Sequence, residues 1–140
     1  MSDPLKNIPY EAIYEAHGHK CPMSTLGARL GDYGRRLLGL SIGQMLGRYE
    51  IPTCARDGIA HTTGCRQDEG TLEVEDLQRH RLLLWPRAGG EGIVVELSER
   101  AMTESRGYRR LDEAGQEVML ERLRQLPDEE LMEAARTRAR

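Results

Sequence analysis

Cysteine and histidine are concentrated in one stretch of this chain, from His17 to Cys65. All three cysteines and three of the four histidines lie there. An odd number of cysteines cannot all pair within one chain. Residues 1–10 carry no apolar core of the kind that a signal peptide needs, so the expected compartment is the cytoplasm, where disulfides are rare. The cysteines are therefore predicted to act as thiols or metal ligands, and the fold must bring them to the histidines.

The composition is that of a soluble globular protein with an aliphatic core. A length of 140 residues suits one domain with a single core, to which a short extension can be added. There is no phenylalanine and one tryptophan, so aliphatic side chains must fill the core. A formal net charge of −3 gives no reason to expect nucleic acid or an acidic membrane as a partner. No window approaches the ~18 apolar residues of a membrane span.

A long helix is predicted from Pro22 to Leu38. Proline fits the first turn of a helix because its missing N–H costs nothing there. Arg29 and Arg35 are expected to be exposed charges on this helix, with anion binding as the alternative. Glycine inside a helix costs about 1 kcal/mol relative to alanine, so three glycines on one face predict that another element packs very close; a frayed helix is the alternative. The glycines are Gly27, Gly31 and Gly34, and the apolar stripe consists of Leu26, Leu30, Leu37 and Leu38.

The order of the remaining elements predicts an α+β fold. Helices are expected to pack on one face of a small mixed or antiparallel sheet, with a helical tail at the C-terminus. Residues 1–100 would form the core domain, and residues 101–140 a helical extension that packs on the core or on a second subunit. The predicted strands are 44–51, 71–74, 80–85 and 92–97, and the further helices are 55–62, 111–126 and a last one from residue 128 with a basic end.

Chain geometry predicts that Cys54 lies near Cys21. The helix after Cys21 carries the chain away by roughly 25 Å, and strand 44–51 can bring it back by roughly 25 Å. Cys54 then lies at the start of the next helix, and a helix N-terminus is expected to lower the pKa of a thiol. His17, His19 and Cys21 alternate along the preceding loop. Spacing this short favours two of these three residues on one metal ion.

Cys65 is predicted to take a different place from Cys54. A helix of about eight residues spans roughly 12 Å, whereas two thiolates on one zinc ion lie about 4 Å apart. Cys65 is therefore expected to line the pocket or to reach the site of a neighbouring subunit. The preferred ligands are His19, Cys21 and Cys54, with His17 next. A lone cysteine is otherwise a small buried hydrophobe, and a lone histidine a satisfied polar group.

The same residues resemble the FmdE family, which takes its name from the formylmethanofuran dehydrogenase operon. The matching segments are His-Gly-His-Lys-Cys-Pro at 17–22, Cys-Ala-Arg-Asp-Gly-Ile at 54–59 and Thr-Gly-Cys at 63–65. The resemblance covers residues 10–100 and implies an α+β core that is often dimeric, with a metal site around the histidines and cysteines. It transfers no reaction. The matching positions are His17, His19, Cys21, Cys54, Asp57 and Cys65, of which Asp57 could orient a ligand or cap a helix.

The chain departs from the family pattern at three places. Met23 replaces a glycine after the proline, and could serve as a soft ligand for another metal or for haem iron. Residues 66–70, Arg-Gln-Asp-Glu-Gly, replace a turn that contains lysine in relatives, which alters any anion site there. No cysteine follows Cys65 in these 140 residues, so we expect no C-terminal zinc finger of the kind that some relatives carry.

Three functions follow as hypotheses. The first is a cytoplasmic homodimer that binds one transition metal per site, with zinc expected and iron or nickel as alternatives, and performs metal-assisted or redox-linked chemistry on a small molecule. The second is a non-catalytic carrier or accessory subunit for a metal or metallocofactor. The third is metal-free thiol chemistry through Cys54.

Overall fold

The long helix predicted after Cys21 is present as α2 (Pro22–Leu38) in the computed structural model, which describes residues 7–140. Cys21 is the N-cap residue, with an extended backbone and a thiol that accepts a hydrogen bond from the Ser24 backbone N–H. Proline at the first position fits this start. Gly39, with a φ of +67°, ends the helix in the left-handed conformation that glycine adopts without strain.

Helix α3 (Ala55–Thr63) packs directly on the glycine face of α2. A Cβ atom on Gly27 would lie 2.6 Å from the Cα of Ala55. On the other side of the contact, a Cβ on Gly58 of α3 would overlap the backbone of α2 at Ala28. Only glycine allows the two backbones to come this close. The close packing predicted from the glycine spacing is therefore confirmed for Gly27 and Gly31, which face α3, whereas Gly34 faces side chains of the sheet.

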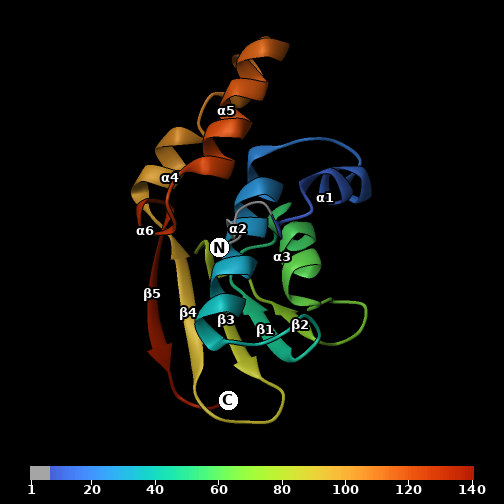
Figure 1. Ribbon diagram of the computed structural model, residues 1–140, viewed down its shortest axis with the longest axis vertical. Helices are drawn as coiled ribbons and strands as arrows, with labels where there is room; N and C mark the ends of the chain where they lie inside the picture. Colours follow the sequence, from blue (N-terminus) through green and yellow to red (C-terminus); the bar gives the residue numbers. More distant parts are fainter. Residues whose placement is uncertain (1–6) are drawn as a thin grey trace.

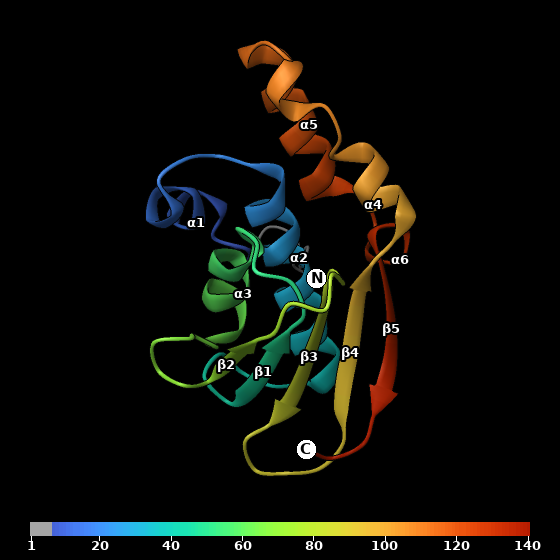
Figure 2. The same cartoon turned by 180° about the vertical axis from the view of Figure 1, so that it is seen from behind.

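The strands form one mixed sheet in the order β2-β1-β3-β4-β5. Strands β1 and β2 are parallel, and each of the other neighbouring pairs is antiparallel. Helices α2 and α3 lie on one face of this sheet, and the view from behind shows the opposite face (Figures 1 and 2). The predicted α+β class is thus confirmed. The bounds are β1 Met45–Tyr49, β2 Leu72–Val74, β3 Arg81–Pro86, β4 Gly92–Leu97 and β5 Met132–Thr137.

The C-terminal region is helical first and then returns to the sheet. Helix α5 projects beyond the ends of the strands (Figure 1). The last helix predicted by the sequence is wrong beyond its first turn, because β5 pairs antiparallel with β4 from Met132 to Thr137. An open strand edge offers a full row of backbone donors and acceptors, and this non-local pairing outweighs the helical spacing of the segment. The helical bounds are α4 Glu99–Glu104, η2 Tyr108–Arg110, α5 Glu113–Gln125 and α6 Asp128–Leu131.

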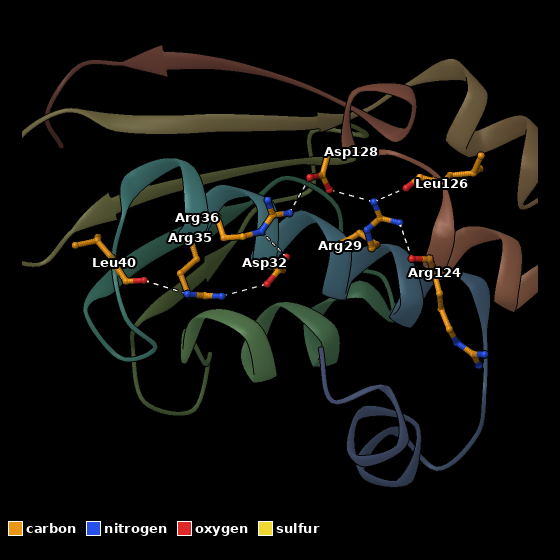
Figure 3. A network of polar contacts seen from close by, with 8 residues as sticks. All are labelled: Arg29, Asp32, Arg35, Arg36, Leu40, Arg124, Leu126 and Asp128. Atoms are coloured by element: carbon orange, nitrogen blue, oxygen red, sulfur yellow. Dashed lines mark hydrogen bonds and ion pairs between the residues drawn. The ribbon is translucent and has the colours of Figure 1, made fainter. Parts of the chain in front are cut away.

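Arg29 fastens the C-terminal region to α2 (Figure 3). Its side chain was expected to be exposed, yet it is fully buried. The guanidinium donates to the carbonyl oxygens of Leu123, Arg124 and Leu126 and forms an ion pair with Asp128 at 3.0 Å. The carbonyl oxygens at the end of α5 have no donor within their own helix. The buried guanidinium supplies the hydrogen bonds that they lack. Arg29 therefore closes the end of α5.

No helix within residues 7–140 combines the length and the apolar content that crossing a bilayer requires.

Candidate metal centre

The loop between α1 (Tyr10–His17) and α2 gathers three metal-ligating side chains. His17 is the last residue of α1, and Gly18, with a φ of +96°, ends that helix. His19 follows in the loop, and Cys21 is the N-cap of α2. One ligand atom from each of His17, His19 and Cys21 lies within 4.8 Å of the other two. The sequence favoured two of these residues together, and the fold brings all three together.

His17 is oriented by Asp57 and presents a nitrogen without a partner. Its Nδ1 lies 2.6 Å from Oδ2 of Asp57, which belongs to α3. Its Nε2 is buried and has no hydrogen-bond partner among residues 7–140. When the neutral ring donates through Nδ1–H to the carboxylate, Nε2 carries the free lone pair. A carboxylate behind an imidazole is the usual support of a metal-bound histidine, so the arrangement fits a metal ion at Nε2.

Cys54 lines the same cleft as Cys21, as the lengths of the intervening helix and strand predicted, but it is outside the group of His17, His19 and Cys21. It is the N-cap of α3 but makes no capping hydrogen bond through its side chain. Burial raises the pKa of the Cys54 thiol, and the neighbouring Cys21 raises it further. The predicted lowering of this pKa by the helix N-terminus is therefore wrong for the metal-free protein. A bound cation acts in the opposite direction, because it stabilises the thiolate.

Cys65 is separated from the three-residue group by the length of α3. Its side chain is fully buried in the core, and its thiol lies 3.5 Å from the Met45 carbonyl oxygen. Burial raises the pKa of this thiol. It nevertheless lines the wall of the same cleft as His17 and Cys54.

Two clefts open onto this group of residues. The first, here called the α3 cleft, has a volume of about 570 Å³, and His17, Cys54, Asp57 and Cys65 are among its lining residues. The second, here called the η2 cleft, has a volume of about 490 Å³ and lies between the loop and the Gly107–Arg110 segment. Met23 and Cys54 line both clefts. A small molecule can therefore approach the His/Cys group from two sides.

The C-terminal region contributes a wall that the sequence did not reveal. The Tyr108 hydroxyl donates to the Lys20 carbonyl oxygen at 3.2 Å, and the Lys20 ammonium lies 3.4 Å from a carboxylate oxygen of Glu117. Tyr108 follows Lys20 by 88 residues. No local spacing connects the two segments, so only the tertiary structure shows that η2 lies against the His/Cys loop.

A family model described as "FmdE, Molybdenum formylmethanofuran dehydrogenase operon" matches residues 16–138. The chain belongs to the FmdE family. The match takes in the His/Cys loop and α3, and it continues through η2, α5 and β5. The resemblance seen in the sequence covered residues 10–100. The family model extends the match through the C-terminal region.

Two known proteins are similar to this FmdE chain. A "Probable S-adenosyl-L-methionine-binding protein" of Archaeoglobus fulgidus is 32% identical over an alignment of 88 positions, which covers 58% of this chain and 24% of that protein. The chain thus spans about a quarter of that relative's length. The crystal structure of a protein of Syntrophus aciditrophicus described as "tungsten formylmethanofuran dehydrogenase subunit e (fmde)-like" superposes with a TM-score of 0.70 at 22% identity, covering 91% of this chain and 69% of that one. This likeness shows the shared fold.

Proposed function

We propose that this FmdE-family protein binds one transition metal ion through His17, His19 and Cys21. The observation that carries the proposal is the buried, unpartnered Nε2 of His17, which Asp57 orients within the three-residue group. A buried nitrogen without a partner costs free energy, and a metal ion at this position removes that cost.

Zinc is the ion that this donor set favours. Imidazole and thiolate are its usual protein ligands, and four-coordinate sites predominate; iron and nickel accept the same donors. Three protein ligands leave a position for a small molecule, at which the ion would supply Lewis-acid or redox-linked chemistry. The chain's own residues would orient the site through Asp57 and admit the small molecule through the two clefts.

The second candidate function is a non-catalytic carrier or accessory subunit for a metal or metallocofactor. It is favoured by Cys54, which lines the same cleft as Cys21 and would complete a set of four protein ligands if its thiol moved into the three-residue group. A site closed in this way is structural or storage-like rather than catalytic. Substituting Cys54→Ser separates the two functions: retained metal with the fold intact supports the open site, and loss of metal supports the closed one.

Metal content tests the proposal directly. The protein, purified without a metal-affinity tag, is expected to hold near-stoichiometric metal by elemental analysis. The His17→Gln variant should lose most of it, whereas the matched His80→Gln variant, in which a half-buried histidine outside the group is changed, should keep it. The proposal fails if the wild-type protein remains metal-free after incubation with zinc, iron and nickel under reducing conditions.

We further propose a cytoplasmic homodimer. Helix α5 projects from the core and exposes Val118, and all three cysteines are free thiols. Light scattering coupled to size-exclusion chromatography should give twice the chain mass of 15.8 kDa. A mass of one chain at micromolar concentration would contradict the dimer.

A further inference from the structure

The η2 cleft differs from the α3 cleft in the charge of its walls. Three cationic side chains line it, from Lys20, Arg109 and Arg110, and none of its lining residues is acidic. In the α3 cleft two arginines are matched by Asp57 and Asp68. Of the two entrances to the His/Cys group, one is therefore charge-balanced and the other is cationic.

The two arginines of η2 are free to bind a ligand. Both are exposed, and neither forms an ion pair within residues 7–140. Among the residues that the structure describes, the Lys20 ammonium forms an ion pair with Glu117 alone, at 3.4 Å and with both side chains about half exposed. An ion pair of this kind contributes little in water, so a ligand can compete for the ammonium group.

The cationic wall is held in place against the loop. Gly107, with a φ of +77°, starts η2, and the Arg110 backbone N–H donates to the Gly107 carbonyl at 3.0 Å. The Tyr108 hydroxyl then bonds the loop itself at Lys20. The positions of the two guanidinium-bearing residues are thus set by backbone contacts that exist before a ligand enters, which lowers the entropy lost on binding.

The η2 cleft is also lined by metal-ligating types of side chain. His19, Cys21 and Cys54 line the same cleft as Arg109 and Arg110. The cleft volume of about 490 Å³ falls within the range of small-molecule sites. A molecule in this cleft would therefore have both donors to a metal and guanidinium groups within its walls.

We propose that the η2 cleft binds a small organic anion whose carboxylate or phosphate group pairs with Arg109 and Arg110 while its other end reaches the metal site. Arginine suits this role because its planar fork of N–H groups matches an oxyanion with two parallel hydrogen bonds. The proposal rests on the proposed metal site and names the class of its ligand. It also gives the C-terminal region a part in recognition.

Binding of two matched thiols to the cobalt(II)-loaded, full-length protein tests this inference. Mercaptopropionate carries a thiolate for the metal and a carboxylate for the arginines, and its methyl ester lacks only the negative charge. Both are titrated at low salt, followed by the thiolate-to-cobalt absorption band and by calorimetry. Inorganic phosphate and acetate, added as competitors, distinguish the two kinds of oxyanion.

The acid is expected to bind about tenfold more tightly than the ester, as two partly exposed ion pairs imply. The Arg109→Gln/Arg110→Gln double variant should lose this preference while its affinity for the ester stays unchanged. Arg106→Gln removes an exposed arginine that does not line the cleft, and it should keep the preference. Raising the salt concentration should reduce the preference in the wild-type protein.

The failures of the two proposals are distinguishable in the same experiment. Equal binding of acid and ester, or a preference that survives in the double variant, overturns the anion site and leaves the metal site standing. If the cobalt band responds to neither thiol, both the anion site and the open coordination position at the metal are refuted. Failure to take up cobalt overturns the metal site, and the inference falls with it.

Discussion

Replacing Arg29 with methionine should destabilise the protein far more than an ordinary helix substitution. Methionine keeps most of the side-chain length but removes the charge and the donors. The guanidinium is fully buried and donates to Leu123, Arg124 and Leu126 and to the Asp128 carboxylate, at distances between 2.5 and 3.1 Å. Hydrogen bonds to charged groups contribute about 1.5–3 kcal/mol each, so full loss of all four would cost about 6–12 kcal/mol.

The expected loss is smaller because several of these acceptors find other partners. Leu126 and Asp128 are partly exposed, so water can reach them, and Asp128 keeps its ion pair with Arg36 at 2.8 Å. The Leu123 carbonyl belongs to a buried residue and remains the main unsatisfied group. Breaking a buried charge pair costs about 3–5 kcal/mol, and we expect a loss of about 4 kcal/mol for Arg29→Met.

Urea unfolding followed by circular dichroism measures this loss. Arg35→Met is the matched control, since Arg35 lies in the same helix but is 25% exposed and bonds Asp32 and the Leu40 carbonyl. The control should lose about 1 kcal/mol. A loss of about 4 kcal/mol corresponds to a melting temperature lower by roughly 12 °C. If Arg29→Met falls within about 1 kcal/mol of Arg35→Met, the role assigned to the buried guanidinium is refuted.

Three further outcomes are expected. Asp57→Asn should weaken metal binding about 10–100-fold in a chelator competition, because the amide no longer holds the His17 ring as a carboxylate does; an unchanged affinity would show that Asp57 does not orient His17. Gly58→Ala should destabilise by about 1–3 kcal/mol in urea. Gly34→Ala should cost less, because its new methyl would meet side-chain methyl groups, with Leu84 Cδ1 nearest at 2.7 Å, whereas the methyl at Gly58 would overlap the backbone of α2. In the metal-free protein, peptide mapping after alkylation should place the midpoint for Cys54 above that of an ordinary thiol, since a raised pKa leaves less thiolate at neutral pH; a midpoint below the ordinary value would contradict burial as the dominant effect.

The sequence predicts those parts of the fold that depend on the spacing of residues close together in the chain. The glycine spacing on α2 predicts the close contact with α3, because glycine inside a helix has a cost that only such packing explains. The return of Cys54 to Cys21 follows from the lengths of one helix and one strand. Both arguments need only local geometry, and both agree with the structure.

The parts that the sequence misses depend on partners far along the chain. The spacing of Leu131, Met132 and Ala135 is helical, yet the open edge of β4 draws the segment into β5. Arg29 is buried because its acceptors come from a segment more than 90 residues later. In the candidate site, the contact between Lys20 and Tyr108 is equally distant in sequence. The pKa of Cys54 is missed for a different reason, since burial outweighs the helix N-terminus.

The position of Arg29 has a consequence for how the chain is made. Within residues 7–140 its acceptors all lie between Leu123 and Asp128, and the strand that pairs with the outer edge of β4 is β5, residues 132–137. While the chain is being synthesised, a completed α2 therefore carries a guanidinium whose acceptors in the described structure have not yet been made, and β4 has no partner strand on its outer edge. The core reaches its final form only after residue 137 has left the ribosome. Until then the unpaired guanidinium disfavours tight packing of the nascent chain. The exposed edge of β4 is a site that a chaperone can shield.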